Sequence, residues 1–145
     1  MMKAITILQP WASLIACGVK KIETRGWKTS YRGPLAIHAA KAIPSIYLFT
    51  PKIEKALWNQ NTPFGKVIAI AELVDCVIVN SFNKFNEVNG VWLSNGDFVE
   101  GNELAFGDYT PGRYAWILQN VQAIKPVPAK GKQRLWEWEG IYDLN

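Results

Sequence analysis

A long apolar run between Gly65 and Val79 constrains the fold more than any other stretch of the chain. The run is rich in valine and isoleucine and is interrupted within by Glu72 and Asp75. A segment of this length and composition is typical of a strand that is covered on both faces. The sequence therefore predicts a strand at the centre of a sheet.

Shorter segments predict further strands and two short helices. Strands are expected in five other stretches of β-branched or alternating residues: 3–8, 21–25, 34–40, 113–121 and 135–138. One helix follows Pro10 and ends at Gly18, and another, within residues 46–58, follows Thr50 as its cap. Residues 80–112 are rich in Asn and Gly and are expected to form a loop with little regular structure. This pattern favours a small β-barrel with helices at its mouth.

Several classes of protein are excluded by what the sequence lacks. No apolar stretch is long enough to span a bilayer, and the N-terminus lacks a signal-peptide core, so a cytoplasmic protein without membrane contact is expected. One histidine and two widely separated cysteines provide no metal-ligand spacing, and no nucleotide-cofactor fingerprint is present. We expect neither a metal nor a cofactor.

Charge is sorted along the chain. Residues 1–41 carry seven Lys or Arg against one acid, whereas residues 42–120 carry five against eight. An electropositive end of this kind suits a phosphate-bearing partner, and an ordinary solvated face would have the same composition.

The segment after the first helix places charges on one side of a predicted strand. Lys21, Glu23 and Arg25 alternate with Ile22 and Thr24, so the charged side chains face outward or into a cleft. Lys20, in the preceding turn, can reach over the same cleft. The simpler alternative is a surface ion pair worth about 0–1 kcal/mol.

Aromatic residues add a second signal. Seven tryptophans occur in 145 residues, several beside Lys or Arg. Flat rings beside cations suit base stacking, worth about 1–3 kcal/mol per base, although most aromatics of a small barrel belong to its core. His38 lies between Ala36 and Ala40, which leaves room above its ring for a substrate or for a tryptophan.

An ordered set of motifs resembles the ASCH domain of the PUA-like superfamily. The set comprises Gln9-Pro10-Trp11-Ala12-Ser13-Leu14, Gly18-x-Lys20-x-x-Glu23-x-Arg25-x-Trp27, Arg32-Gly33-x-Leu35-x-Ile37, Gly65-x-Val67-x-Ala69 and Lys130-Gly131-Lys132-x-x-Leu135-Trp136. The resemblance implies a single domain over residues 1–145 of α+β, mainly β class. It also implies a partly open β-barrel of about six strands, with two or three short helices at a cleft.

The same resemblance implies binding of RNA or another nucleic acid in the cleft. A single-stranded RNA or a modified nucleotide is the leading candidate ligand. The residues expected to contact it are Trp11, Lys20, Lys21, Glu23, Arg25, Trp27, Tyr31, Arg32, His38 and Lys41.

Two alternatives stay open. The segment is similar to that of small acetylcytidine amidohydrolases, except that Glu23 stands where those enzymes have a threonine. A hydrolase acting on RNA or a modified nucleoside would use Lys20 and Glu23 as catalytic residues. The third possibility is a protein-interaction module in transcription-related regulation.

Overall fold

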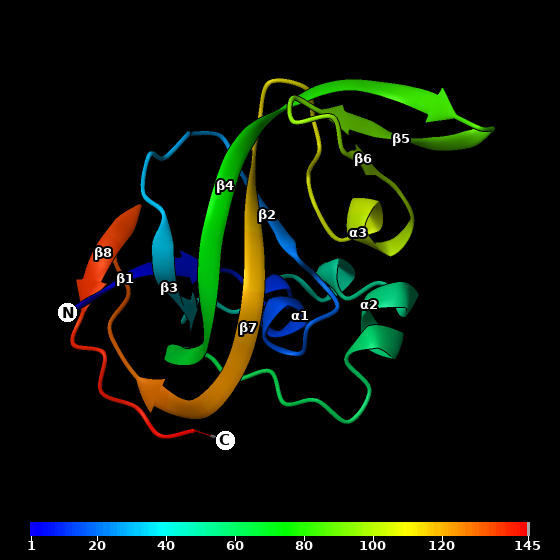
Figure 1. The fold of residues 1–145 in the computed structure, drawn as a ribbon. Helices are drawn as coiled ribbons and strands as arrows, with labels where there is room; N and C mark the ends of the chain where they lie inside the picture. Colours follow the sequence, from blue (N-terminus) through cyan, green and yellow to red (C-terminus); the bar gives the residue numbers. More distant parts are fainter. Residues whose placement is uncertain (145) are drawn as a thin grey trace.

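A computed structural model describes residues 1–144 of the chain and shows one curved sheet with short helices on one side (Figure 1). The elements are β1 (Met2–Ile7), α1 (Trp11–Ala16), β2 (Ile22–Arg25), β3 (Gly33–Ala39), a 3-10 turn (Ile46–Leu48), α2 (Pro51–Ala56), β4 (Lys66–Phe85), β5 (Val88–Leu93), β6 (Phe98–Val99), α3 (Gly101–Ala105), β7 (Tyr114–Pro128) and β8 (Leu135–Trp138).

Strand β4 is the central strand that its apolar run predicts. It pairs antiparallel with β3 on one side and with β7 on the other. Its buried residues Val67, Ala69 and Leu73 belong to the core. The strand is longer than predicted because its last residues pair with β5 outside the main sheet.

The strand order of the main sheet is β2-β7-β4-β3-β1-β8, with β1 parallel to β3. The edge strands β2 and β8 do not pair with each other, so the sheet is not closed into a barrel. The α+β, mainly β class is confirmed, with eight strands where about six were predicted. Strand β7 also continues past its predicted end, because Val127 and Pro128 pair with the start of β4, and a register irregularity next to them accommodates Pro126.

The prediction of an irregular loop over residues 80–112 was wrong. This segment contains the end of β4, then β5, β6 and α3, which form an arm projecting from the sheet (Figure 1). Asn86 and Glu87 both have positive φ, so they make a two-residue hairpin turn, and not a loop. Gly90 is required here, because a Cβ would lie 2.4 Å from the Val99 carbonyl oxygen.

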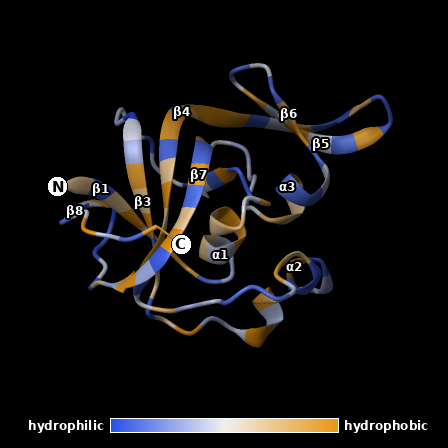
Figure 2. Ribbon diagram, turned by 60° about the horizontal axis from the view of Figure 1, so that its bottom comes forward, coloured by the Kyte–Doolittle hydropathy of each residue, from blue (hydrophilic) through white to orange (hydrophobic). Residues whose placement is uncertain are grey.

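The helices lie on one side of the sheet (Figure 2), where α1 packs against β3, β4 and β7, while α3 contacts β5. Helix α1 buries Leu14 and Ile15, and Gly18 ends the helical segment with a φ of 87°, as predicted. The Thr50 hydroxyl accepts a hydrogen bond from the Ile53 amide at 3.4 Å and caps α2, also as predicted. No helix within residues 1–144 is long and apolar enough to cross a membrane.

Candidate functional site

A pocket of about 210 Å³ opens where α1, β2 and the end of β1 meet the segment that follows α3. Its lining residues come from three separate parts of the sequence: Ile7, Leu8, Trp11, Lys20, Glu23, Thr24, Arg25, Phe106, Gly107, Asp108 and Arg113. Ligand pockets for drug-sized molecules span about 300–1,000 Å³, so this pocket suits a smaller group such as one base.

Lys20 is the most unusual residue of the pocket. Its side chain is only 1% exposed, and its Nζ has no hydrogen-bond partner among the described residues. Burial lowers the pKa of Lys20, while the nearby carboxylates of Glu23 and Glu103 oppose that shift. The chain therefore holds a buried amine whose donors are unused, in the wall of a pocket.

Gly107 makes room for this amine. A Cβ at Gly107 would lie 3.3 Å from the Lys20 Nζ and 2.7 Å from Cε2 of Tyr109. The Tyr109 hydroxyl is buried without a hydrogen bond to any residue within 1–144, and burial raises its pKa. Glu103 accepts a hydrogen bond from the Lys21 amide at 2.8 Å through one carboxylate oxygen, while its other oxygen is buried and has no hydrogen-bond partner in the same part of the chain.

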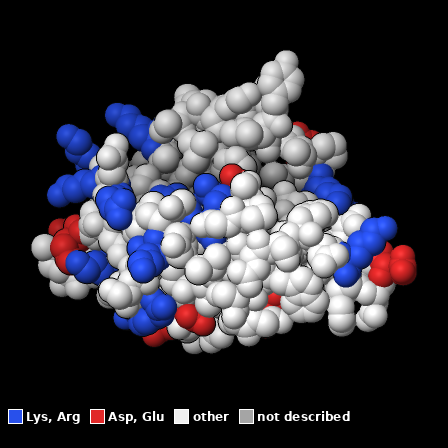
Figure 3. Space-filling model, turned by 90° about the horizontal axis from the view of Figure 1, so that it is seen from above, with Lys and Arg blue, Asp and Glu red and all other residues white. Residues whose placement is uncertain are grey.

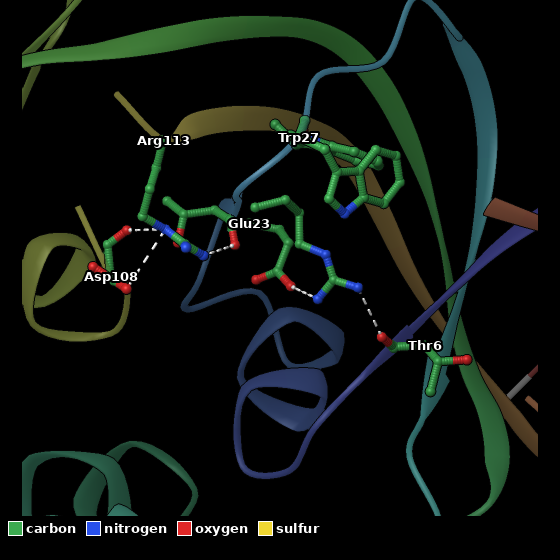
Figure 4. A network of polar contacts seen from close by, with 8 residues as sticks. Thr6, Glu23, Trp27, Asp108 and Arg113 are labelled. Carbon is green, nitrogen blue, oxygen red and sulfur yellow. Dashed lines mark hydrogen bonds and ion pairs between the residues drawn. The ribbon is translucent and has the colours of Figure 1, made fainter. Parts of the chain in front are cut away.

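Glu23 lies on β2 beside Lys20, with its carboxylate in the pocket wall (Figure 4). Arg25 donates from Nη1 to the Glu23 carboxylate at 3.2 Å and from Nη2 to the Thr6 carbonyl oxygen at 3.2 Å. Burial raises the pKa of Glu23, and the cations of Lys20 and Arg25 oppose this shift. Burial thus shifts both Lys20 and Glu23 toward their neutral forms.

Arg113 holds the far wall of the pocket against β2 (Figure 4). Its Nη2 donates to the Thr24 carbonyl oxygen at 3.1 Å and its Nε donates to the Asp108 carbonyl oxygen at 3.1 Å. The Asp108 carboxylate lies 3.6 Å from Arg113 Nε and accepts hydrogen bonds from Thr110, which lower the pKa of Asp108.

Four predicted contact residues line the pocket together, and the others lie elsewhere. Trp11, Lys20, Glu23 and Arg25 line it, whereas the exposed Lys21 lines a separate surface hollow next to β7. The remaining five predicted residues do not line the pocket.

Trp27 packs edge-on against Trp116, with ring centroids 4.8 Å apart, and the Arg134 guanidinium lies 4.3 Å above its ring. The Tyr31 hydroxyl donates to the carbonyl oxygen of Pro34, near the start of β3 and outside the pocket. Both side chains therefore already have partners within the described chain.

Arg32, His38 and Lys41 also lie outside the pocket. Arg32 forms an exposed ion pair with Asp75 at 3.4 Å. His38 is buried against Trp136, with ring centroids 5.4 Å apart, and its Nε2 is 2.8 Å from the Ala129 carbonyl oxygen. A tryptophan therefore fills the space above the histidine ring.

Sequence reasoning missed the wall formed by Phe106, Gly107, Asp108 and Arg113. It treated most of this stretch as loop, although the run Gly107-Asp108 ahead of Arg113 offered a local signal of turn and charge. Thr24 also lines the pocket despite the alternation that predicts it on the opposite face.

Basic side chains are unevenly distributed over the surface. Figure 3 shows Lys and Arg concentrated on one half of the face seen from above Figure 1. The pocket itself combines Lys and Arg side chains, the two acidic residues Glu23 and Asp108, and Trp11. Such a set can offer donors, an acceptor and a flat apolar face to one planar polar ligand.

Comparisons with known proteins agree on one family. Residues 5–128 match the family model described as ASCH domain. Over 143 residues, 92% of this chain, the sequence is 28% identical to activating signal cointegrator 1 of Homo sapiens and 25% identical to that of Mus musculus. The chain spans 22% of the length of each of these relatives.

Proposed function

The chain belongs to the ASCH domain family, and from this premise we propose that it binds single-stranded RNA or a modified nucleotide, with one base held beside Lys20. The observation that carries the proposal is the buried Lys20 Nζ, which has no hydrogen-bond partner in the described part of the chain. An unsatisfied buried donor costs about 1–3 kcal/mol, and a bound acceptor atom would offset this cost.

The other pocket residues have complementary roles in this proposal. Glu23 accepts hydrogen bonds from the edge of the base, because its carboxylate lies in the pocket wall and Arg25 donates to only one of its two oxygens. Trp11 offers a ring for stacking. Arg25 and Arg113 are only partly buried at 24% and 31% exposure, so their remaining N–H groups can reach a phosphate.

Tryptophan fluorescence tests this proposal directly, because Trp11 lines the pocket. Nucleoside monophosphates and a single-stranded RNA are titrated into wild type, Lys20→Met and Lys21→Met at low and moderate salt. We expect a saturable change of emission in wild type and Lys21→Met that weakens with salt, and a loss of at least tenfold in affinity in Lys20→Met. Absence of any response in wild type at low salt would refute the proposal.

A hydrolase acting on RNA or a modified nucleoside is the second candidate. The pKa values of Lys20 and Glu23 are shifted in opposite directions, a pattern that suits a general base beside a general acid. Prolonged incubation with single-stranded RNA and with N-acylated nucleosides, followed by product analysis, tests it. Turnover that Glu23→Gln abolishes without weakening binding would support the hydrolase, and unchanged substrates would exclude it for these compounds.

A protein partner is the third candidate. The relatives carry the name activating signal cointegrator 1, and the word cointegrator suits a protein that contacts other proteins. This candidate gains support if no nucleic acid or nucleotide binds the wild-type chain.

A further inference from the structure

A second, open groove lies where the ends of three strands meet. Lys41 follows the end of β3, Lys66 begins β4, and Lys130 follows the end of β7. All three line a groove of about 780 Å³ that Phe64 and Pro128 also line. We call it the lysine groove.

The strand junction fixes the spacing of these lysines. The Ala129 amide donates to the Gly65 carbonyl oxygen at 3.1 Å, and the Gly65 amide donates to the Ala39 carbonyl oxygen at 2.9 Å. In the sheet register, Lys66 lies opposite both Ala39 and Pro128. Positive charges distant in sequence are therefore brought together by backbone pairing, and not by a flexible loop.

The charges of the lysine groove are not neutralised within the described residues. No carboxylate lines the groove, and none of its three lysines belongs to the ion pairs found in residues 1–144. Phe64, which lines the same groove as the three lysines, is 36% exposed. Unpaired cations around an exposed ring match the combination that single-stranded nucleic acid uses, with phosphates on lysines and a base on the ring.

We propose that the lysine groove binds the sugar–phosphate backbone of single-stranded nucleic acid, with a base stacked on Phe64. A hydrogen bond links the segments that carry the two sites, because Gln9, next to the pocket residue Leu8, donates to the carbonyl oxygen of Pro63, next to the groove residue Phe64, at 2.9 Å. This proposal deepens the proposed function and rests on it for the nature of the ligand. An acidic protein segment would use the lysines equally well but would leave the exposed ring without a role.

The test compares the full chain carrying Lys41→Gln, Lys66→Gln and Lys130→Gln with wild type. The matched control carries Lys52→Gln, Lys55→Gln and Lys84→Gln, which removes the same charge from exposed lysines outside the groove. Binding of a labelled single-stranded RNA of about 12 nucleotides is measured by anisotropy between about 50 and 200 mM salt. The same titration is repeated with single-stranded DNA and with polyglutamate.

Each phosphate contact with a single strand contributes about 0.7 to the slope of log affinity against log salt. Losing three contacts should make the slope of the groove variant shallower than that of wild type by about 2. When salt rises fourfold, the affinity of the variant should therefore fall by a factor roughly 20 times smaller than the factor for wild type. The control variant should keep the slope of wild type. Binding of nucleoside monophosphates to the pocket should be the same in all three proteins.

Several results would overturn the proposal. An unchanged slope in the groove variant, or an equal decrease in the control, would show that the groove does not contact the strand. Polyglutamate binding that matches or exceeds RNA binding and depends on the three lysines would assign the groove to an acidic protein. If nucleoside monophosphates fail to bind wild type while the slope still depends on the groove, only the pocket proposal fails.

Discussion

Replacing Lys20 with methionine should stabilise the unliganded protein. Methionine has a similar length and is apolar, so it can occupy the same buried space without an unsatisfied donor. An unsatisfied buried polar group costs about 1–3 kcal/mol, and no ion pair to Lys20 exists among residues 1–144 to offset the burial of its charge. For a domain of this size each kcal/mol corresponds to about 4 °C in Tm, so we expect an increase of about 4–12 °C.

The increase in Tm of Lys20→Met over wild type should depend on pH, which provides a second check. The pKa of Lys20 is lowered in the folded state from its usual 10.5. At pH values between the lowered pKa and 10.5, the unfolded chain therefore binds more protons than the folded chain. Stability of wild type therefore rises with pH in that window, and the penalty from Lys20 is fully present below the lowered pKa. The difference in Tm between Lys20→Met and wild type should be largest at low and neutral pH and should narrow as pH approaches 10.5.

Thermal unfolding followed by circular dichroism measures both effects, with Lys21→Met as the matched control. Lys21 is exposed, so its replacement should change the free energy of unfolding by no more than about 0.5 kcal/mol. A Tm of Lys20→Met equal to or below that of wild type would refute the reasoning. It would mean that the amine is stabilised in the free protein by a group such as the Glu23 carboxylate and is not held unpaired for a ligand.

Three further predictions concern the packing and charge around the site. Gly107→Ala should lower stability by about 1–3 kcal/mol and weaken nucleotide binding, because the new methyl group would lie 2.7 Å from the Tyr109 ring; calorimetry and the fluorescence titration measure both. Glu23→Gln should remove a decrease of stability with rising pH. Because the pKa of the Glu23 carboxyl is raised, the folded state binds more protons than the unfolded state above the usual value of 4.5. Tm values measured over about pH 4–8, the range in which a raised carboxyl titrates, should depend less on pH in the variant than in wild type, and parallel profiles would contradict this. Gly131→Ala should destabilise the protein by about 1–3 kcal/mol, because its methyl group would lie 2.7 Å from the His38 ring. His38 lies outside the pocket, so nucleotide affinity per folded molecule should not change. Weakened nucleotide binding would show that the two regions are coupled.

The local sequence was sufficient for the elements whose signals are local. The valine-rich run specified β4, Thr50 specified the start of α2, and Gly18 specified the end of the α1 segment. The motif around Lys20 also identified one wall of the pocket, because the first helix, the turn and the next strand are consecutive in the chain.

The Asn- and Gly-rich segment shows where local signals fail. The same residues that punctuate loops also form tight hairpin turns, and only the pairing partners of each strand distinguish the two. Val79 and Leu93 are paired across the arm and fully or almost fully buried, although a stretch of polar residues separates them in the sequence.

The sequence by itself determined the family, the mainly β class and the candidate segment from Lys20 to Arg25. Only the tertiary structure decided that Lys20 is buried without a hydrogen-bond partner among residues 1–144 and that Arg113 lines the pocket. It also assigned His38 to packing against a tryptophan that lies almost a hundred residues away. The physical reason is that burial, desolvation and ion pairing depend on which distant segments pack together, whereas strand and turn preferences are properties of neighbouring residues.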